Sequence, residues 1–93
     1  MGAIIKTDKR LDISHAPKLE KELMDLIDAG ETEILLDMAD TTYISSVALR
    51  ALLKAKKGLK AAGGKLVLRN VTDSVMEVFD VTNFTSVLTF EEE

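Results

Sequence analysis

Two adjacent hydroxyl side chains, Ser45 and Ser46, lie where an apolar run ends and a leucine-rich helical pattern begins. This arrangement predicts a strand-to-helix corner at residues 43–49. A serine at a helix start can accept hydrogen bonds from the free backbone N–H groups of the first turn. The positive end of the helix dipole would also favour a phosphate placed there. The chemistry that this corner offers is therefore helix capping or reversible phosphorylation.

Other reactive arrangements fit the sequence poorly. There is no Gly-x-Ser-x-Gly elbow, and the lone histidine, His15, is predicted to be a solvated residue in the first turn of a helix. Asp37 and Asp40 follow a strand, but no glycine-rich phosphate loop precedes them and no histidine or lysine base accompanies them. We predict a hydrogen-bonding role for Asp37 and a turn or capping role for Asp40. The sequence predicts no catalytic residue, metal ligand or cofactor, and a nucleotide-binding enzyme is the weakest class considered.

Composition favours one small globular domain over residues 1–93, with an acidic, frayed tail at residues 90–93. The absence of cysteine excludes disulfides and thiolate zinc sites. A net charge of −4, from 12 basic and 16 acidic residues, argues against a nucleic-acid-binding surface and favours protein or small-molecule partners. The apolar run at the N-terminus is too short for a signal peptide, and no later segment approaches a membrane span. We therefore expect a cytoplasmic protein.

The apolar runs predict an α/β fold. Runs of strand length alternate with helical patterns, which is typical of βαβ units. We expect a mostly parallel, mixed β-sheet of about four strands packed with three to four α-helices. The predicted strands are residues 3–7, 33–37, 65–69 and 86–90. The apolar runs in the second and third of these are continuous rather than alternating, which predicts central strands covered on both faces.

Residues typical of helix caps and helix ends predict the positions of the helices between these strands. Ser14 is the expected cap of a first helix over residues 14–29. A second helix is expected from Ser46 to about residue 62, where Gly63-Gly64 ends it.

A third, shorter helix is expected after Asn70. Ser74 with Glu77 three residues later resembles a capping box, and Val75, Val78 and Phe79 would form the buried edge of this helix. Asn83 suits a left-handed turn before the last strand.

The second predicted helix carries five basic residues on one broad arc, opposite an apolar arc. This arc is either a solvated face or a docking face for an acidic partner. Leu49 and Leu53 fall on the lysine side of the predicted helix. They either widen the buried apolar arc or, if exposed, form the apolar centre of an interface. The basic residues are Arg50, Lys54, Lys56, Lys57 and Lys60, and the apolar residues are Ala48, Ala51, Leu52, Ala55 and Leu59.

An ordered series of short motifs from Leu11 onward resembles the STAS domain of bacterial anti-sigma factor antagonists. The resemblance covers nearly the whole chain after residue 10, and it implies a single STAS-like α/β domain. The motifs are Leu11-Asp12, Ala16-Pro17-Lys18-Leu19-Glu20, Ile34-Leu35-Leu36-Asp37-Met38, Tyr43-Ile44-Ser45-Ser46, Leu49, Gly63-Gly64-Lys65-Leu66 and Val75-x-x-Val78-Phe79.

This resemblance implies a non-enzymatic partner-switching protein. In the family, the unphosphorylated antagonist binds an anti-sigma factor, often also a serine kinase, and so frees the sigma factor. Phosphorylation of a serine breaks the complex, and a phosphatase restores it. The family corner reads Asp-Ser-Ser-Gly-Leu, and its first serine, which is the phosphorylated one, corresponds to Ser46. Taking this corner together with the basic arc of the second helix, we expect the partner-binding residues to be Ser45, Ser46, Val47, Leu49, Arg50, Leu53, Lys54 and Lys57.

The corner departs from the family pattern at three positions. Ser45 replaces an acidic residue, Val47 replaces the second serine, and Ala48 replaces a glycine. The β-carbon of Ala48 is expected to crowd an approaching partner loop. These departures favour an alternative, a STAS adaptor or soluble subunit of a transport or signalling complex that no phosphate switches. Two family strands usually precede Leu11-Asp12, and with about ten residues available we expect the first to be missing or very short, leaving a sheet edge open.

Overall fold

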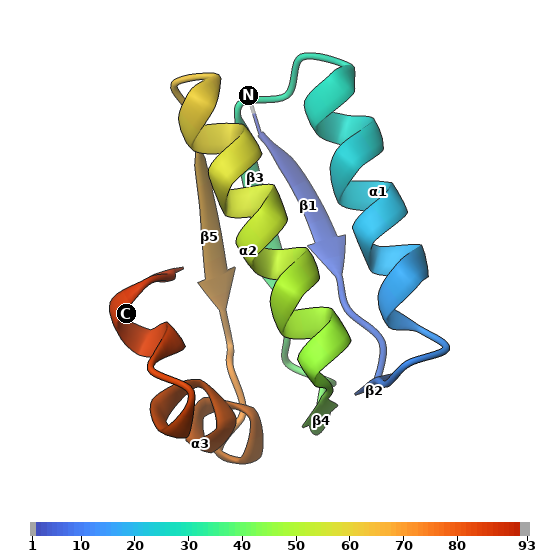
Figure 1. The fold of residues 1–93 in the computed structure, drawn as a ribbon, viewed down its shortest axis with the longest axis vertical. Helices are drawn as coiled ribbons and strands as arrows, with labels where there is room; N and C mark the ends of the chain where they lie inside the picture. The colour runs from blue at the N-terminus through green and yellow to red at the C-terminus, as the bar shows by residue number, and fades with distance from the viewer. Residues whose placement is uncertain (1, 92–93) are drawn as a thin grey trace.

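The computed structural model describes residues 2–91, and its main sheet has four strands in the order β1-β3-β5-β6 (Figure 1). These strands are β1 (Ala3–Lys6), β3 (Glu33–Asp37), β5 (Lys65–Arg69) and β6 (Thr89–Phe90). A separate two-stranded pair joins β2 (Arg10–Leu11) to β4 (Tyr43–Ile44). Each described strand pair is parallel. The predicted mostly parallel sheet is therefore confirmed, and β3 and β5 have the predicted bounds.

Three α-helices accompany the sheet, as predicted. They are α1 (Ala16–Asp28), α2 (Ser46–Ala61) and α3 (Asp73–Val81), and a short 3-10 helix, η1 (Phe84–Ser86), follows. The first two lie side by side over one face of the main sheet, and α3 lies near the end of β5 (Figure 1). Within residues 2–91, no helix has both the length and the apolar composition needed to cross a bilayer.

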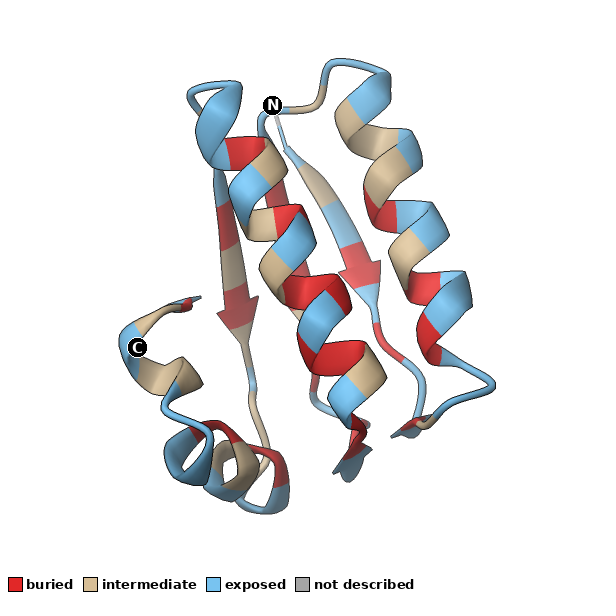
Figure 2. Ribbon diagram, viewed as in Figure 1, coloured by how far each residue is buried: buried red, intermediate tan, exposed pale blue. Residues whose placement is uncertain are grey.

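Burial alternates along the central strands (Figure 2). Ile34 and Leu36 are buried beneath the helices, whereas Leu35 between them is only half-buried. The same alternation occurs in β5, where Val67 is half-buried. The prediction that both faces are covered is therefore wrong. A continuous apolar run had suggested two buried faces, but α1 and α2 cover only one, and the other carries a shallow open hollow.

The start of α1 is organised by Asp12 rather than by Ser14. The Asp12 carboxylate accepts from the backbone N–H of His15 at 3.0 Å, from the His15 ring at 2.6 Å and from the Ser14 hydroxyl at 2.9 Å. The hydrogen bonds from the His15 ring and from Ser14 lower the pKa of Asp12 below its usual range. The predicted Ser14 cap is wrong because this hydroxyl donates to Asp12 and the helix begins only at Ala16.

The start of α3 also differs from its prediction. Thr72 precedes the helix, and its hydroxyl donates to the carbonyl of Thr41 at 2.6 Å. Ser74 donates to the carbonyl of Thr42 at 3.1 Å, so it does not form the predicted capping box with Glu77. Both hydroxyls reach across the fold, and they tie α3 to the loop that leads into β4.

The C-terminal segment is better ordered than the sequence suggests. Asn83 adopts the predicted left-handed conformation with φ of 64°, but η1 follows it and β6 begins only at Thr89. Phe90 packs against Phe79, with ring centroids 5.8 Å apart. The backbone N–H of Glu91 donates to the carbonyl of Leu68 at 2.8 Å. Phe90 and Glu91 are thus paired rather than frayed, and residues 92–93 of the predicted tail lie outside the described residues.

Candidate functional site

Ser45 is the N-cap of α2. Its backbone is extended, and its Oγ accepts a hydrogen bond from the N–H of Ala48 at 3.3 Å. The same hydroxyl donates to the carbonyl of Leu11 at 2.8 Å, and the backbone N–H of Ser45 donates to that carbonyl at 2.9 Å. The side chain is buried. Ser45 therefore joins the β2–β4 pair to the first turn of α2, which is a structural role.

Ser46 has the opposite environment. It is the first residue of the 16-residue helix α2, and it is exposed. Its side chain forms no hydrogen bond within the described part of the chain. The side chain of Ser46 is therefore open to solvent, and the helix start would stabilise a negative charge placed on it. The corner therefore has one buried serine that caps the helix and one exposed serine at the first position of the helix.

This division predicts unequal effects of two alanine substitutions. Ser45→Ala should lower the free energy of unfolding by about 1–2 kcal/mol, because it removes the cap and a buried hydrogen bond. Ser46→Ala should change it by less than about 0.5 kcal/mol, because the side chain is exposed. Urea unfolding followed by circular dichroism would measure both values. Equal losses in the two variants would contradict the assignment of Ser45 as the cap.

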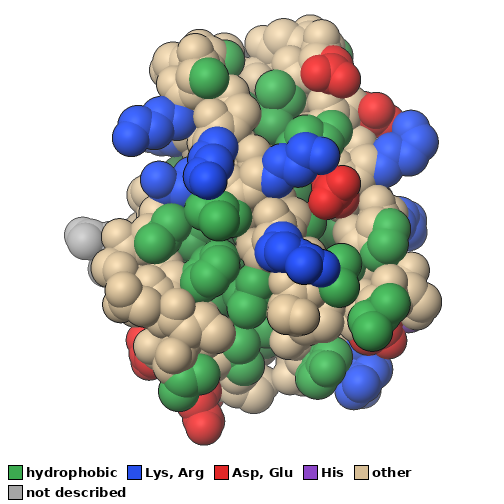
Figure 3. Space-filling view, in the orientation of Figure 1, with side chains coloured by type: hydrophobic (Ala, Val, Ile, Leu, Met, Phe, Trp, Pro, Cys, Tyr) green, Lys and Arg blue, Asp and Glu red, His purple; other side chains and the backbone are tan. Residues whose placement is uncertain are grey.

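The exposed face of α2 is basic, and lysine and arginine side chains stand out along this helix in Figure 3. Arg50, Lys54 and Lys57 are exposed, although Lys54 also approaches Glu20 of α1 at 3.6 Å. The opposite, apolar arc is buried as predicted, and its members are Ala48, Ala51, Leu52, Ala55 and Leu59. The structure thus leaves a basic surface on the side of α2 that faces away from the sheet.

The two leucines on the lysine side of α2 differ in burial. Leu49 is 7% exposed and belongs to the core, so it widens the buried stripe. Leu53 is half-buried. Of the predicted partner-binding residues, Ser45 and Leu49 therefore present little side-chain surface, whereas Leu53 offers an apolar contact among the basic groups.

The departures from the family pattern lie at two different depths. Val47 is half-buried and packs against the core. Ala48 is fully buried. The expectation that its β-carbon crowds a partner loop is therefore wrong, because this position of α2 faces the protein interior.

A buried hydroxyl network holds the loop in front of the corner. Thr41 is fully buried, and its hydroxyl hydrogen-bonds the hydroxyl of Thr7 and donates to the carbonyl of Asp8 at 2.7 Å. The next residue, Thr42, donates its backbone N–H to the carbonyl of Lys9 at 2.9 Å. These bonds fix the path of the chain into β4. Sequence reasoning missed them, and the polar run at residues 40–42 between two apolar elements was the available signal.

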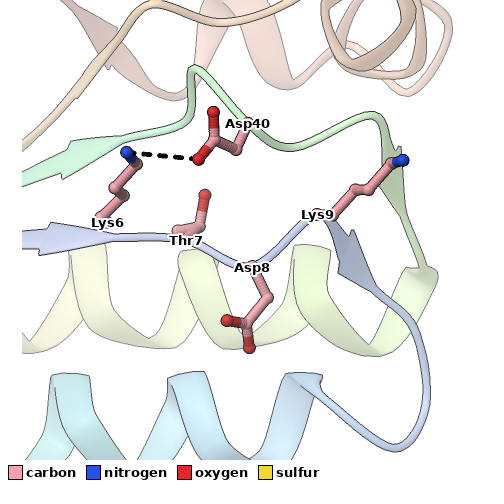
Figure 4. Close-up of a pocket in the computed structure, with 5 residues that line it drawn as sticks. All are labelled: Lys6, Thr7, Asp8, Lys9 and Asp40. Atoms are coloured by element: carbon pink, nitrogen blue, oxygen red, sulfur yellow. Dashed lines mark ion pairs between the residues drawn. The ribbon is translucent and has the colours of Figure 1, made fainter.

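A polar hollow of about 620 Å³ lies beside this network, at the C-terminal end of β1 (Figure 4). Lys6 and Asp40 form an ion pair across it, with 3.2 Å between Nζ and Oδ2, and Thr7 lies beside this pair. The side chains of Asp8 and Lys9 point away from this pair (Figure 4). The polar groups therefore do not converge on a point where a ligand would sit. Among the described residues, no group of three or more acidic or histidine side chains could hold a metal ion.

Asp37, the last residue of β3, and Asp40, in the following turn, have the predicted structural roles. The Asp37 carboxylate accepts from the side-chain amide of Asn70 at 3.2 Å and from the backbone N–H of Ala39 at 3.1 Å. These two bonds lower the pKa of Asp37. Asp40 lies in the turn before β4, where the N–H of Thr41 donates to the carbonyl of Met38 at 3.1 Å.

An exposed patch beside the corner was absent from the predicted binding set. The Arg10 guanidinium lies 4.4 Å from the centroid of the Tyr43 ring, and Ile13 nearby in the sequence is also exposed. Arg10 and Tyr43 become neighbours only because β2 pairs with β4. Because β2 and β4 have only two residues each, local sequence patterns do not reveal this pair or the contact between these side chains.

The comparison with protein families decides the classification. The family model described as the STAS domain matches residues 2–93. The chain belongs to the STAS domain family. This assignment confirms the resemblance inferred from the ordered motifs.

Relatives of this STAS domain include bacterial regulators. BtrV of Bordetella bronchiseptica is 39% identical over 74 residues, which cover 80% of this chain but only 64% of BtrV, so the chain spans less than two thirds of that relative. The anti-sigma-B factor antagonist of Bacillus subtilis is 27% identical over 78 residues, covering 84% of this chain and 71% of the relative.

Solved structures share the STAS fold. The anti-sigma factor antagonist SpoIIAA, in its unphosphorylated form, superposes with a TM-score of 0.83 at 19% identity. The superposition covers 99% of this chain and 82% of that one. The phosphorylated form of SpoIIAA, described as a Bacillus cell fate determinant, has a TM-score of 0.73 at 19% identity and covers 97% and 82% of the two chains.

Proposed function

We propose that this STAS domain is an anti-sigma factor antagonist whose binding to an anti-sigma factor is controlled by phosphorylation of Ser46. The single observation that carries the switch is the separation of the two serines. Ser45 is buried and caps α2, whereas Ser46 is exposed at the helix start. The relative in Bacillus subtilis, an anti-sigma-B factor antagonist, supports the choice of partner. The proposed role is that of a non-enzymatic protein of the bacterial cytoplasm.

The proposed docking surface is a stripe along α2. Ser46, Arg50, Leu53 and Lys57 follow at intervals of four, three and four residues, so they lie on one side of the helix. The stripe combines a half-buried leucine with exposed basic groups, and such a surface suits an acidic partner. Lys54 and Val47 flank it. The proposed partner has a serine kinase-like fold, and a phosphatase would reverse the modification.

Phosphorylation would change the docking surface while preserving the fold. A phosphate adds about −1.5 to −2 charges at pH 7. At the first residue of α2 the helix dipole stabilises that charge, and Arg50 lies one turn away to pair with it. The same charge would oppose an acidic partner and would have to be desolvated on binding. The switch therefore costs affinity rather than stability.

Ser46→Asp tests this proposal against the uncharged, similarly sized Ser46→Asn. The anti-sigma factor would be captured on the wild-type chain, identified by mass spectrometry, purified and titrated by calorimetry. We expect Ser46→Asp to weaken binding about 10- to 100-fold, or roughly 1.4–2.8 kcal/mol. Its melting temperature should be unchanged or slightly higher, because a carboxylate at the helix start is favourable.

Ser46→Asn should retain most of the affinity, since it adds no charge. Equal binding by the wild-type and Ser46→Asp chains would rule out control by negative charge at this position. Loss of binding accompanied by a lower melting temperature in Ser46→Asp would instead indicate damage to the fold.

An unswitched STAS adaptor, or a soluble subunit of a transport or signalling complex, is the second candidate. It is favoured by the environment of Ser45, which replaces the acidic residue of the family corner and whose hydroxyl is engaged by Leu11 and Ala48. No carboxylate at this position is then available to orient Ser46. Intact-mass measurement after incubation with the captured kinase distinguishes the two, because only a switch requires a stoichiometric phosphate on Ser46.

A further inference from the structure

The open face of the main sheet carries an apolar row across its three longest strands. Ile4 pairs in register with Leu35, and Leu35 pairs with Val67. Val67 pairs in turn with Thr89 of β6. Ile4 is 67% exposed, and the row borders a hollow of about 520 Å³. Since α1 and α2 cover the other face, these side chains have no covering layer within residues 2–91.

Charged rows border this apolar row on both sides. Two residues away along the strands, Glu33 pairs in register with Lys65. On the other side, Asp37 pairs with Lys6 and with Arg69. Glu91 extends that second row, since its Oε1 lies 3.6 Å from Nε of Arg69. Both signs therefore alternate across the sheet within each row, around an apolar centre.

We propose that this face binds a second copy of the chain, with a twofold axis parallel to the strands and passing between β3 and β5. Such an axis reverses the order of the strands and leaves each row opposite itself. Glu33 then faces Lys65 of the second copy, and Asp37 faces Arg69 of the second copy. At the outer strands, Lys6 faces Glu91. Every charged position thus meets the opposite sign.

The charge pattern rejects the other simple arrangement. A twofold axis perpendicular to the strands would leave each strand opposite itself and exchange the two charged rows. Glu33 would then face Asp37, and Lys65 would face Arg69. Like charges across an interface are costly, so the alternation selects the axis parallel to the strands. In that arrangement the two sheets run in the same direction, as in aligned sheet packing.

The size of the face predicts a weak dimer. Four strands about 4.8 Å apart, of which the longest have five residues at about 3.3 Å per residue, give a face of at most roughly 19 by 16 Å. This is smaller than the roughly 800 Å² that each partner buries in a standard interface. The basic stripe on α2 lies on the opposite side of the sheet and stays accessible. The inference is therefore independent of the proposed function.

Sedimentation equilibrium of the whole chain, from about 10 µM to about 1 mM, tests the dimer, because these concentrations detect the weak association expected of a small interface. Glu33→Lys alone and Lys65→Glu alone should each weaken self-association at least tenfold, because each places like charges across the axis. An equimolar mixture of the two variants should restore association. In the mixed dimer, position 33 of each copy faces position 65 of the other copy, and both of these contacts join a lysine to a glutamate.

Matched charge changes on α1 provide the controls. Asp28→Lys and Lys21→Glu alter the net charge by the same amounts at exposed positions of α1, which covers the opposite face of the sheet, so they should leave self-association unchanged. The melting temperature of each variant would confirm that it is folded. A wild-type chain that stays monomeric at 1 mM would overturn the proposal, and so would a mixture that associates no better than its components. The proposal would also be overturned if the amides of this face were protected from hydrogen exchange only when a different protein is bound, and not at high concentrations of the chain alone.

Discussion

Gly64→Ala is expected to lower the free energy of unfolding by at least about 3 kcal/mol. A β-carbon at this position would overlap the carbonyl oxygen of Thr32 and would lie 2.7 Å from its carbonyl carbon. These are backbone atoms, so no side-chain rotation relieves the clash. The carbonyl of Thr32 also accepts from the N–H of Lys65 at 2.8 Å, and Gly64 itself donates to the carbonyl of Leu59 at 2.7 Å. A shift large enough to admit the methyl group would break these bonds, which join the end of α2 to the starts of β3 and β5.

Gly58→Ala is the matched control, because it makes the same substitution inside α2. Its β-carbon would meet only the side chain of Ile27, at 3.4 Å from Cδ1. Alanine in a helix interior is favoured over glycine by about 1 kcal/mol, so this variant should be equally stable or more stable. Urea unfolding should therefore shift the two midpoints in opposite directions. Similar midpoints for both variants would mean that the turn at Gly64 adjusts at little cost.

Phe79→Ala should cost about 3–5 kcal/mol, since it empties a fully buried position in the core. The aromatic ring of Phe79 is tilted by 60° against Phe90, so the loss should be felt most strongly in β6. This strand has only two residues, and β5 is the only strand that it pairs with among the described residues. Chemical denaturation would measure the global loss. Amide exchange at Glu91, whose N–H donates to Leu68, would report whether β6 separates first.

Val81→Ala removes an apolar side chain from the same helix, but at a position that is 78% exposed. We expect it to change stability by less than about 0.5 kcal/mol. If Phe79→Ala and Val81→Ala lost the same stability, the loss would come from a general weakening of α3 rather than from the missing packing of the Phe79 ring. If Glu91 kept its protection in Phe79→Ala, the proposed dependence of β6 on this ring would be wrong.

The sequence predicts best those elements that local patterns define. The bounds of β3 and β5 are correct because each is a short apolar run with polar residues at both ends. The start of α2 is correct because a hydroxyl residue precedes a helical pattern. The end of α2 lies close to its predicted position because Gly63, with φ of 77°, follows the helix. In each case the relevant interactions lie within a few residues along the chain.

Elements that depend on distant partners escape such reasoning. Strands β2 and β4 have two residues each, which is too short to show any periodicity, and they exist only as a pair. The hydroxyl of Ser74 had an available partner in its own helix, yet it donates to Thr42 across the fold. The apolar run at Leu35 predicts two covered faces, although a strand with one buried and one half-exposed face produces the same pattern.

The candidate site was predicted in part. Helical periodicity predicts that the five basic residues of α2 share one arc, and four of them are exposed while Lys56 is half-buried. The same helical wheel puts Leu49 on that side, although Leu49 is buried. The position of a residue on a helical wheel gives the direction in which its side chain leaves the helix, but its burial also depends on the neighbouring elements. Here α2 packs against α1 and β5. The two serines looked alike from local pattern alone. Their different depths follow from Leu11, whose carbonyl binds Ser45 from a strand 34 residues earlier.

The parallel pairing of the strands also determines how this chain can fold. Each pair in the β1-β3-β5 ladder and in the β2–β4 pair joins residues roughly 30 positions apart, so no hairpin is available to form first. The entropy of closing these long loops is lost before any strand gains a hydrogen-bonded neighbour. We therefore expect the transition state to require α1 and α2 to meet over a partly formed sheet, and the corner at Ser45 to become ordered only when that nucleus has assembled.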